Sequence, residues 1–133
     1  MDENITHRQK EIADRFLLEL ERHLADMKSG KAETYYGIKQ MAELSFINPN
    51  HLSDTIKKVL GKSPCRIFEE KLIEICKELI GNSNKPINEI AYTFSYEPSN
   101  FTKFFKRYTG TTPREFRNQN FNSKTEKVTI FSV

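Results

Sequence analysis

The chain carries one pattern twice, at an offset of 49 residues. Between residues 42 and 64, five positions hold the same residue as the position 49 residues later: Ala42, Pro49, Lys57, Gly61 and Pro64 match Ala91, Pro98, Lys106, Gly110 and Pro113. Conservative pairs lie between them: Leu52 with Phe101, Ser53 with Thr102, Ile56 with Phe105, Lys58 with Arg107 and Ser63 with Thr112. Chance matching does not keep apolar, basic and turn positions together at one offset. The chain therefore contains a duplicated structural unit, which constrains its fold.

The length of 133 residues suits one compact domain or two small lobes. The chain is 37% hydrophobic and has no Trp, so its core draws on ten Phe together with Leu and Ile. No apolar run approaches the roughly 20 residues that span a bilayer, and the N-terminus lacks the basic and apolar pattern of a signal peptide. We expect a cytoplasmic protein with no membrane partner.

The cysteines and histidines indicate no metal site or cofactor. Cys65 and Cys76 fall on one predicted helix, roughly 16 Å apart along its axis, which is beyond the reach of a disulfide. We therefore expect free, buried thiols in a reducing cytosol. No Cys or His pair has the spacing of zinc ligands, and the GxSxG, HExxH, P-loop and GxGxxG patterns are absent. The sequence predicts no enzymatic activity.

Apolar periodicity predicts helices almost throughout, and therefore an all-α fold. The first helix, over residues 6–28, carries one apolar stripe formed by Ile12, Phe16, Leu20, Leu24 and Met27. A dimerisation seam is one interpretation of this stripe, but its steps lack a sustained heptad alternation. We expect the stripe to pack against the first copy of the repeat as ordinary core.

Each copy of the repeat has the pattern of a helix, a tight turn and a second helix. The predicted helices span residues 37–44 and 49–60 in the first copy, and 86–94 and 98–108 in the second. Asn48 is the predicted N-cap of one second helix, and Glu97 occupies the same place in the other. Gly61 and Gly110 follow their ends. The two copies are expected to have the same local architecture.

The spacing within each copy is typical of a helix-turn-helix motif. Ala42 and Ala91 fall where two helices cross closely, and ten residues later Leu52 and Phe101 fill the angle between them. Such motifs often place Gly at a positive φ in the turn, where this chain has Phe46 and Ser95. Because Ser tolerates that conformation poorly and Phe tolerates it worse, we expect differently shaped turns.

The second helix of each copy divides into an apolar face and a short polar face. The predicted inner positions are Leu52, Ile56, Val59 and Leu60 in the first copy, and Phe101, Phe104, Phe105 and Tyr108 in the second. The predicted outer positions are Asn50, Ser53, Asp54 and Lys57, then Ser99, Thr102, Lys103 and Lys106. Asn, Ser, Thr and Lys can reach base edges in a major groove. Any amphipathic helix has a polar face, but two matched faces favour nucleic-acid recognition.

A long apolar helix is predicted between the two copies, from Pro64 to Ile80, with Ser63 as N-cap and Gly81 beyond its end. Its length of roughly 25 Å and half a lobe at each end bridge the spacing of about 34 Å between successive major-groove faces. The predicted segments are an N-terminal helix packing on the first lobe (1–33), a first helix-turn-helix (34–63), this linker helix (64–81), a second helix-turn-helix (82–117) and a tail (118–133).

Two stretches resemble AraC/XylS-type transcription regulators. INEIAYTFSYEPSNFTKFFKRYTGTTPREFR, residues 87–117, is similar to that family's C-terminal signature, and AELSFINPNHLSDTIKKVLGKSP, residues 42–64, is similar to its first helix-turn-helix. The resemblance covers residues 6–117. It implies about seven helices in two lobes, with one recognition element per lobe in adjacent major-groove segments of double-stranded DNA. The base-facing residues it implies are Asn50, Ser53, Asp54, Ser99, Asn100, Thr102 and Lys103.

Charge is unevenly distributed between the lobes. Residues 1–33 carry six basic and eight acidic side chains, whereas residues 82–117 carry six basic and three acidic ones. Phosphate contacts are expected from Lys57, Lys58, Lys62, Lys103, Lys106, Arg107 and Arg114. A carboxylate at Asp54 repels phosphate and only accepts hydrogen bonds from bases. We expect a monomer on an asymmetric site, gripped more tightly by the second copy, with the first contributing discrimination.

A second function class stays open on the sequence alone. A helical protein-interaction module would use the same faces to bind RNA polymerase or a sensor subunit rather than DNA. Most members of the AraC/XylS family carry a separate sensor or oligomerisation domain, and no segment here is large enough to form one. In the tail, alternation over 128–133 suits an edge strand, although we favour disorder or a contact with a partner.

Overall fold

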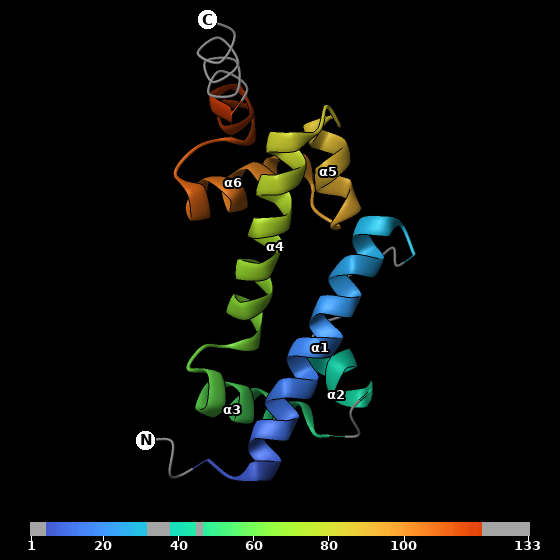
Figure 1. Cartoon of the computed structure of the whole chain (residues 1–133), viewed down its shortest axis with the longest axis vertical. Helices are drawn as coiled ribbons and strands as arrows, with labels where there is room; N and C mark the ends of the chain where they lie inside the picture. Colours follow the sequence, from blue (N-terminus) through green and yellow to red (C-terminus); the bar gives the residue numbers. More distant parts are fainter. Residues whose placement is uncertain (1–4, 32–37, 45–46, 121–133) are drawn as a thin grey trace, which may run out of the picture. The chain divides into compact units, whose positions relative to one another are not determined.

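The computed structural model describes residues 5–31, 38–44 and 47–120 (Figure 1). Within these ranges the chain forms seven helices and no strand, which confirms the all-α prediction. The helices are α1 (His7–Ser29), α2 (Ile38–Leu44), α3 (Pro49–Leu60), α4 (Pro64–Asn82), α5 (Ile87–Thr93), α6 (Pro98–Thr109) and a last helix over 113–120. No helix among the described residues is long and apolar enough to cross a membrane. The edge strand predicted over 128–133 lies outside the described residues.

The chain divides into two compact units, Met1–Leu72 and Ile73–Val133. The first unit holds α1, α2, α3 and the first part of α4, and the second holds the rest of α4, α5, α6 and the last helix. Each unit therefore contains one copy of the repeat. The division falls inside α4, the helix that the sequence placed between the copies.

Helix α1 begins and ends with capping groups encoded locally. Thr6 Oγ1 accepts a hydrogen bond from the backbone N–H of Gln9, and Gln9 Oε1 accepts one from the backbone N–H of Thr6, both at 3.0 Å. This capping box satisfies two donors of the first turn. Gly30 ends the helix with a φ of +87°. The five apolar residues of the predicted stripe are all buried and α1 packs against α3, so the prediction of ordinary core packing is confirmed.

The C-terminal ends of α3 and α6 are alike. Gly61 has a φ of +75° and Gly110 a φ of +83°, and the N–H of each donates to a lysine carbonyl four residues earlier, on Lys57 and Lys106. The distances are 2.9 and 2.8 Å. Glycine adopts this left-handed conformation without the strain that a Cβ adds. The repeated glycines thus end the two second helices as predicted.

Helix α4 is longer than the sequence prediction. Ser63 Oγ accepts from the backbone N–H of Arg66 at 3.2 Å, which confirms the predicted N-cap. The helix continues to Asn82, however, so the prediction that Gly81 lies beyond its end is wrong. A Cβ at Gly81 would collide with the side chain of Asn120 on the last helix and contact the ring of Phe116. Gly81 therefore allows close helix packing instead of ending a helix.

The two cysteines are free, but they differ in environment. Cys76 is buried, and burial raises the pKa of its thiol to about 12. Cys65, in the first turn of α4, is exposed, so the prediction of two buried thiols is wrong for Cys65. Its position faces solvent because the apolar side of this end of α4 is formed by Ile67 and Phe68.

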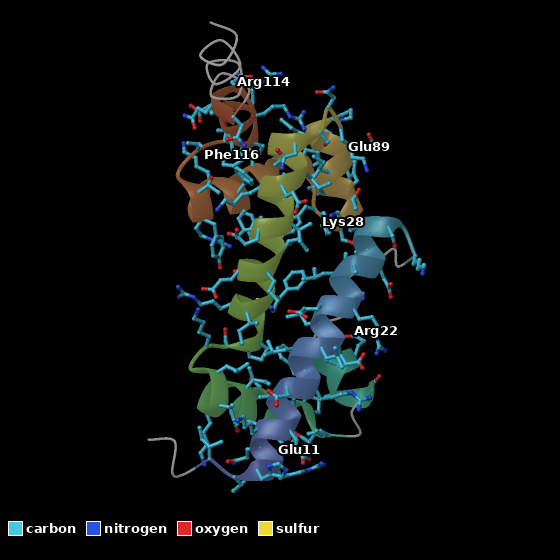
Figure 2. The ribbon with its side chains drawn as sticks, in the orientation of Figure 1. Glu11, Arg22, Lys28, Glu89, Arg114 and Phe116 are labelled. Atoms are coloured by element: carbon cyan, nitrogen blue, oxygen red, sulfur yellow. The ribbon has the colours of Figure 1, made fainter. Side chains whose placement is uncertain are left out.

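The last helix is held on the second unit by the aromatic and basic residues that end the signature. The ring of Phe116 packs edge-on against that of Phe105, with centroids 5.3 Å apart, and Figure 2 labels Phe116 on this helix. Arg117 donates from Nε to the carbonyl oxygen of Ile80 at 2.9 Å and from Nη2 to that of Lys85 at 2.7 Å. Arg117 therefore satisfies a carbonyl in the last turn of α4, where a helix lacks internal donors.

Candidate nucleic-acid interface

The first helix-turn-helix consists of α2 and α3. Ala42 of α2 and Leu52 of α3 are buried, in agreement with a close crossing filled by one large apolar side chain. Helix α2 packs against α3. After the turn, the backbone N–H of Ile47 donates to the carbonyl of Ala42 at 2.9 Å. Asn48 then caps α3, because its Oδ1 accepts from the N–H groups of the next two helical residues after Pro49, at 2.8 and 3.3 Å.

The second helix-turn-helix, α5 and α6, has the same backbone arrangement. Ala91 and Phe101 are buried, and the backbone N–H of Tyr96 donates to the carbonyl of Ala91 at 2.9 Å, as Ile47 does to Ala42. Glu97 occupies the N-cap position of α6 but makes no side-chain capping bond. The equivalent position therefore carries a weaker cap than Asn48 supplies to α3.

The turn before α6 reaches its shape despite lacking glycine. Ser95 has a φ of +64°, in the left-handed region that the sequence led us to expect Ser to avoid. The expectation of a differently shaped turn is therefore wrong for the second copy, where the backbone hydrogen bonds from Ser95 to Tyr92 and from Tyr96 to Ala91 close the turn around this φ. The matching position, Phe46, lies outside the described residues.

The inner faces of α3 and α6 are filled by different side chains. Phe101, Phe104 and Phe105 are buried in α6, whereas Leu52, Thr55 and Ile56 are buried in α3. The remaining predicted inner residues, Val59, Leu60 and Tyr108, are half-buried. Thr55 was missed by the sequence reading, although it stands 49 residues before Phe104 and the repeat itself indicated an inward position.

The outer face of α3 presents short polar groups and charges of both signs. Asn50, Asp54, Lys57 and Lys58 are exposed, and Ser53 is half-buried. No ion pair or hydrogen bond engages the carboxylate of Asp54 among the described residues, although Lys57 and Lys58 follow it by three and four positions. This face is therefore free to meet an external partner.

The outer face of α6 is polar and basic, without an acidic residue. Ser99, Asn100, Lys103, Lys106 and Arg107 are exposed, and Thr102 is half-buried. Thr102 Oγ1 donates to the carbonyl of Pro98 at 3.1 Å, so its hydroxyl can offer an external group only an acceptor. The guanidinium carbon of Arg107 lies 5.5 Å from the centroid of the Tyr108 ring, at the range of a cation–π contact.

Two further predicted phosphate ligands differ in how their charge is engaged. Lys62 Nζ lies 2.8 Å from Glu70 Oε1, and Arg66 Nε lies 3.2 Å from Glu70 Oε2. The hydrogen bonds from Lys62 and then Arg66 hold the pKa of Glu70 below its usual value. Arg114 is exposed on the last helix (Figure 2). Lys62 thus shares the carboxylate of Glu70 with Arg66, and this carboxylate competes with phosphate for Lys62. The sequence did not predict the pairing, because Lys62 and Glu70 are eight residues apart.

The site is composed of helix faces and holds no cluster suited to a metal. Within the described ranges, no group of three or more His, Cys, Asp or Glu side chains could hold a metal ion. The exposed polar groups within α3 and α6 are amides, hydroxyls, lysines, one imidazole, one guanidinium and one carboxylate. Such groups can donate to and accept from base edges and neutralise phosphates.

A family model described as a helix-turn-helix domain matches residues 41–119 of this chain. The chain belongs to the AraC-type helix-turn-helix family. In this AraC-type chain the matched region runs from α2 through the last helix and so includes both copies of the repeat. The resemblance inferred from residues 42–64 and 87–117 is confirmed.

Among curated proteins, the AraC-type chain is 30% identical over 88 residues to the HTH-type transcriptional regulator YobQ of Bacillus subtilis. The match covers 65% of the chain and 36% of YobQ, so the chain spans little more than a third of that relative.

Two solved structures share the fold of the AraC-type chain. The C-terminal domain of AraT, a response regulator from Geobacillus stearothermophilus, matches with a TM-score of 0.72 and 24% identity, over 87% of this chain and 88% of that one. The DNA-binding domain of AdpA, a global transcriptional factor whose crystal structure contains a target DNA, matches with a TM-score of 0.61 and 15% identity, over 73% and 91% of the two chains.

Proposed function

We propose that this AraC-type chain is a sequence-specific, double-stranded DNA-binding transcription regulator that reads adjacent major-groove segments with α3 and α6. The observation that carries the proposal is the pair of matched second helices, each with a buried apolar face and an exposed polar face. A recognition helix needs this division, because its apolar side fixes it to the domain while its other side reaches the bases. YobQ is a transcriptional regulator and AdpA a transcriptional factor, and the similarity of the chain to both supports the same function.

The outward residues divide by the chemistry they offer to DNA. Seven side chains are proposed to face bases: Asn50, Ser53, Asp54, Ser99, Asn100, Thr102 and Lys103. Six are proposed to face phosphates: Lys57, Lys58, Lys62, Lys106, Arg107 and Arg114. Since Glu70 competes for Lys62, the other five cations carry most of the phosphate interaction in this proposal. Lys103 can serve either role, because an ammonium reaches guanine acceptors and phosphates alike.

A gel-shift titration with the full chain tests this function. We expect random-sequence duplex DNA to bind at low salt, with log affinity falling by about 4 to 5 per tenfold rise in salt if five phosphates are neutralised. Lys106→Ala should weaken binding by a similar factor on every sequence and reduce that slope, whereas Lys103→Ala should change sequence preference. No shift at low salt, or a flat salt response, contradicts DNA binding.

The outcome also separates the alternative partners. A chain that shifts no duplex would act instead as a helical interaction module for RNA polymerase or a sensor subunit, the alternative that the sequence left open. A chain that shifts duplex DNA can still take RNA polymerase or a sensor domain as further partners. Selection from a random duplex library would then identify the site that α3 and α6 read.

A further inference from the structure

Asp54 is the only acidic residue within α3 or α6, the two proposed recognition helices. It is exposed on the same face as Asn50 and Lys57, one helical turn from each. Among the described residues its carboxylate has neither a salt bridge nor a hydrogen bond. A pairing role with the nearby lysines therefore does not account for it. A negative charge on a surface that approaches phosphates weakens binding, unless the carboxylate meets a hydrogen-bond donor.

The base edges of the major groove offer such a donor selectively. An ionised carboxylate only accepts hydrogen bonds. Guanine presents the acceptors O6 and N7, and thymine presents the acceptor O4 and a methyl group, so all of these repel or exclude it. Adenine places its amino donor beside the acceptor N7, whereas the edge of cytosine offers its 4-amino donor without an adjacent acceptor. Cytosine is the base that fits an isolated carboxylate.

We infer that Asp54 makes α3 select a cytosine, by accepting a hydrogen bond from the 4-amino group of that base. The inference rests on the proposed DNA binding and adds the specificity of one position. The equivalent residue of the other lobe, 49 positions later, is Lys103, which only donates and suits guanine. In this inference, equivalent positions of the two helices recognise opposite groups: Asp54 accepts from the amino donor of cytosine, and Lys103 donates to the acceptors of guanine.

Site selection with four forms of the full chain tests the inference. The wild type should enrich cytosine at one position of the segment read by α3, with about a tenfold loss of affinity for other bases there. Asp54→Asn should shift that position to adenine, because an amide both donates to N7 and accepts from the 6-amino group. Asp54→Ala should lose the preference. Asp14→Asn, which makes the same charge change at an exposed residue of α1, should keep the wild-type preference.

A second measurement separates a lost contact from a general change of affinity. In the selected duplex the cytosine is replaced by pyrimidin-2-one, which lacks only the 4-amino group. The wild type should bind this duplex about tenfold more weakly, and Asp54→Ala should bind both duplexes within twofold of each other. Circular dichroism checks that the variants keep their helices, as expected for an exposed position.

These experiments distinguish a failure of the proposed DNA binding from a failure of the proposed role of Asp54. If the wild type shifts no duplex at all, DNA binding is wrong. If the wild type selects a sequence but Asp54→Asn selects the same one, DNA binding stands and the role of Asp54 is overturned. Equal wild-type affinity for the cytosine and pyrimidin-2-one duplexes overturns it as well.

Discussion

The two helix-turn-helix copies have the same backbone arrangement but differ in the side chains that form their cores and cap their second helices. The elements common to both are the buried alanines, the glycines at helix ends and the hydrogen bond that closes each turn onto Ala42 or Ala91. The core side chains differ, since α3 buries leucine, threonine and isoleucine where α6 buries three phenylalanines. The comparison indicates that backbone requirements are kept where only one or two residue types satisfy them, while core and surface chemistry diverge.

The aromatic core makes the second copy more sensitive to truncation. Phe101 is fully buried, and its ring centroid lies 6.3 Å from that of Phe104 and 6.1 Å from that of Phe105. Phe101→Ala should lower the free energy of unfolding by about 3–5 kcal/mol, through lost burial and the cavity left behind. Chemical denaturation followed by circular dichroism measures the change.

The matched variant in the first copy is Leu52→Ala, which removes a smaller buried side chain and should cost about 2–5 kcal/mol. Tyr92→Ala is the surface control, because this side chain is 60% exposed. A smaller loss for Phe101→Ala than for Leu52→Ala would mean that the aromatic cluster relaxes into the cavity, and the proposed difference between the cores would be wrong.

The caps of the second helices provide a smaller contrast. Asn48 accepts from two backbone N–H groups of α3, whereas Glu97 makes no side-chain bond to α6. Asn48→Ala should therefore destabilise the chain by about 1 kcal/mol, and Glu97→Ala should cost only the charge–dipole interaction, about 0.3–1 kcal/mol. Thermal unfolding at two salt concentrations checks this, because salt should reduce only the Glu97 effect.

In the turn before α6, a substitution should stabilise the chain, in contrast to the destabilising substitutions above. Ser95 holds a φ of +64°, a conformation that costs a residue with a Cβ about 1–2 kcal/mol. Ser95→Gly removes that strain but frees the unfolded chain, so we expect a net stabilisation of about 0.5 kcal/mol by the same assay. The control is Gly110→Ala, where φ is +83° and the sign reverses. If Ser95→Gly destabilises the chain, the serine side chain holds the turn.

The predictable features of this chain were those encoded by neighbours in sequence. The spacing of apolar residues predicted where the helices lie. The N-cap of α3 was predictable from Asn48, because a capping hydrogen bond joins residues close in sequence. The missed role of Gly81 depends on a residue distant in sequence. Gly81 lies within α4, where an added Cβ would collide with the side chain of Asn120, and no spacing rule links positions so far apart.

In the candidate site, too, the features that depend on local helix geometry were predictable from the sequence, and a contact between elements was not. Periodicity identified which residues of α3 and α6 point outward, because the inner and outer faces follow from helix geometry. It did not identify the pairing of Lys62 with Glu70, which depends on how the chain turns between α3 and α4. The base-facing and phosphate-facing roles remain predictions, because they depend on the DNA.

The smallest expected effect concerns this pairing, which has no counterpart in the second copy, where Thr111 stands in place of Lys62. Glu70 binds Lys62 and Arg66, so Glu70→Gln should release both for phosphates and raise affinity for random duplex two- to threefold at low salt, with a steeper salt slope. Glu78→Gln, the same charge change at an exposed residue of α4, is the control. Equal gains in both variants would indicate an effect of net charge alone. A gain specific to Glu70→Gln would show that this carboxylate in α4 restrains the phosphate contacts of Lys62 and Arg66.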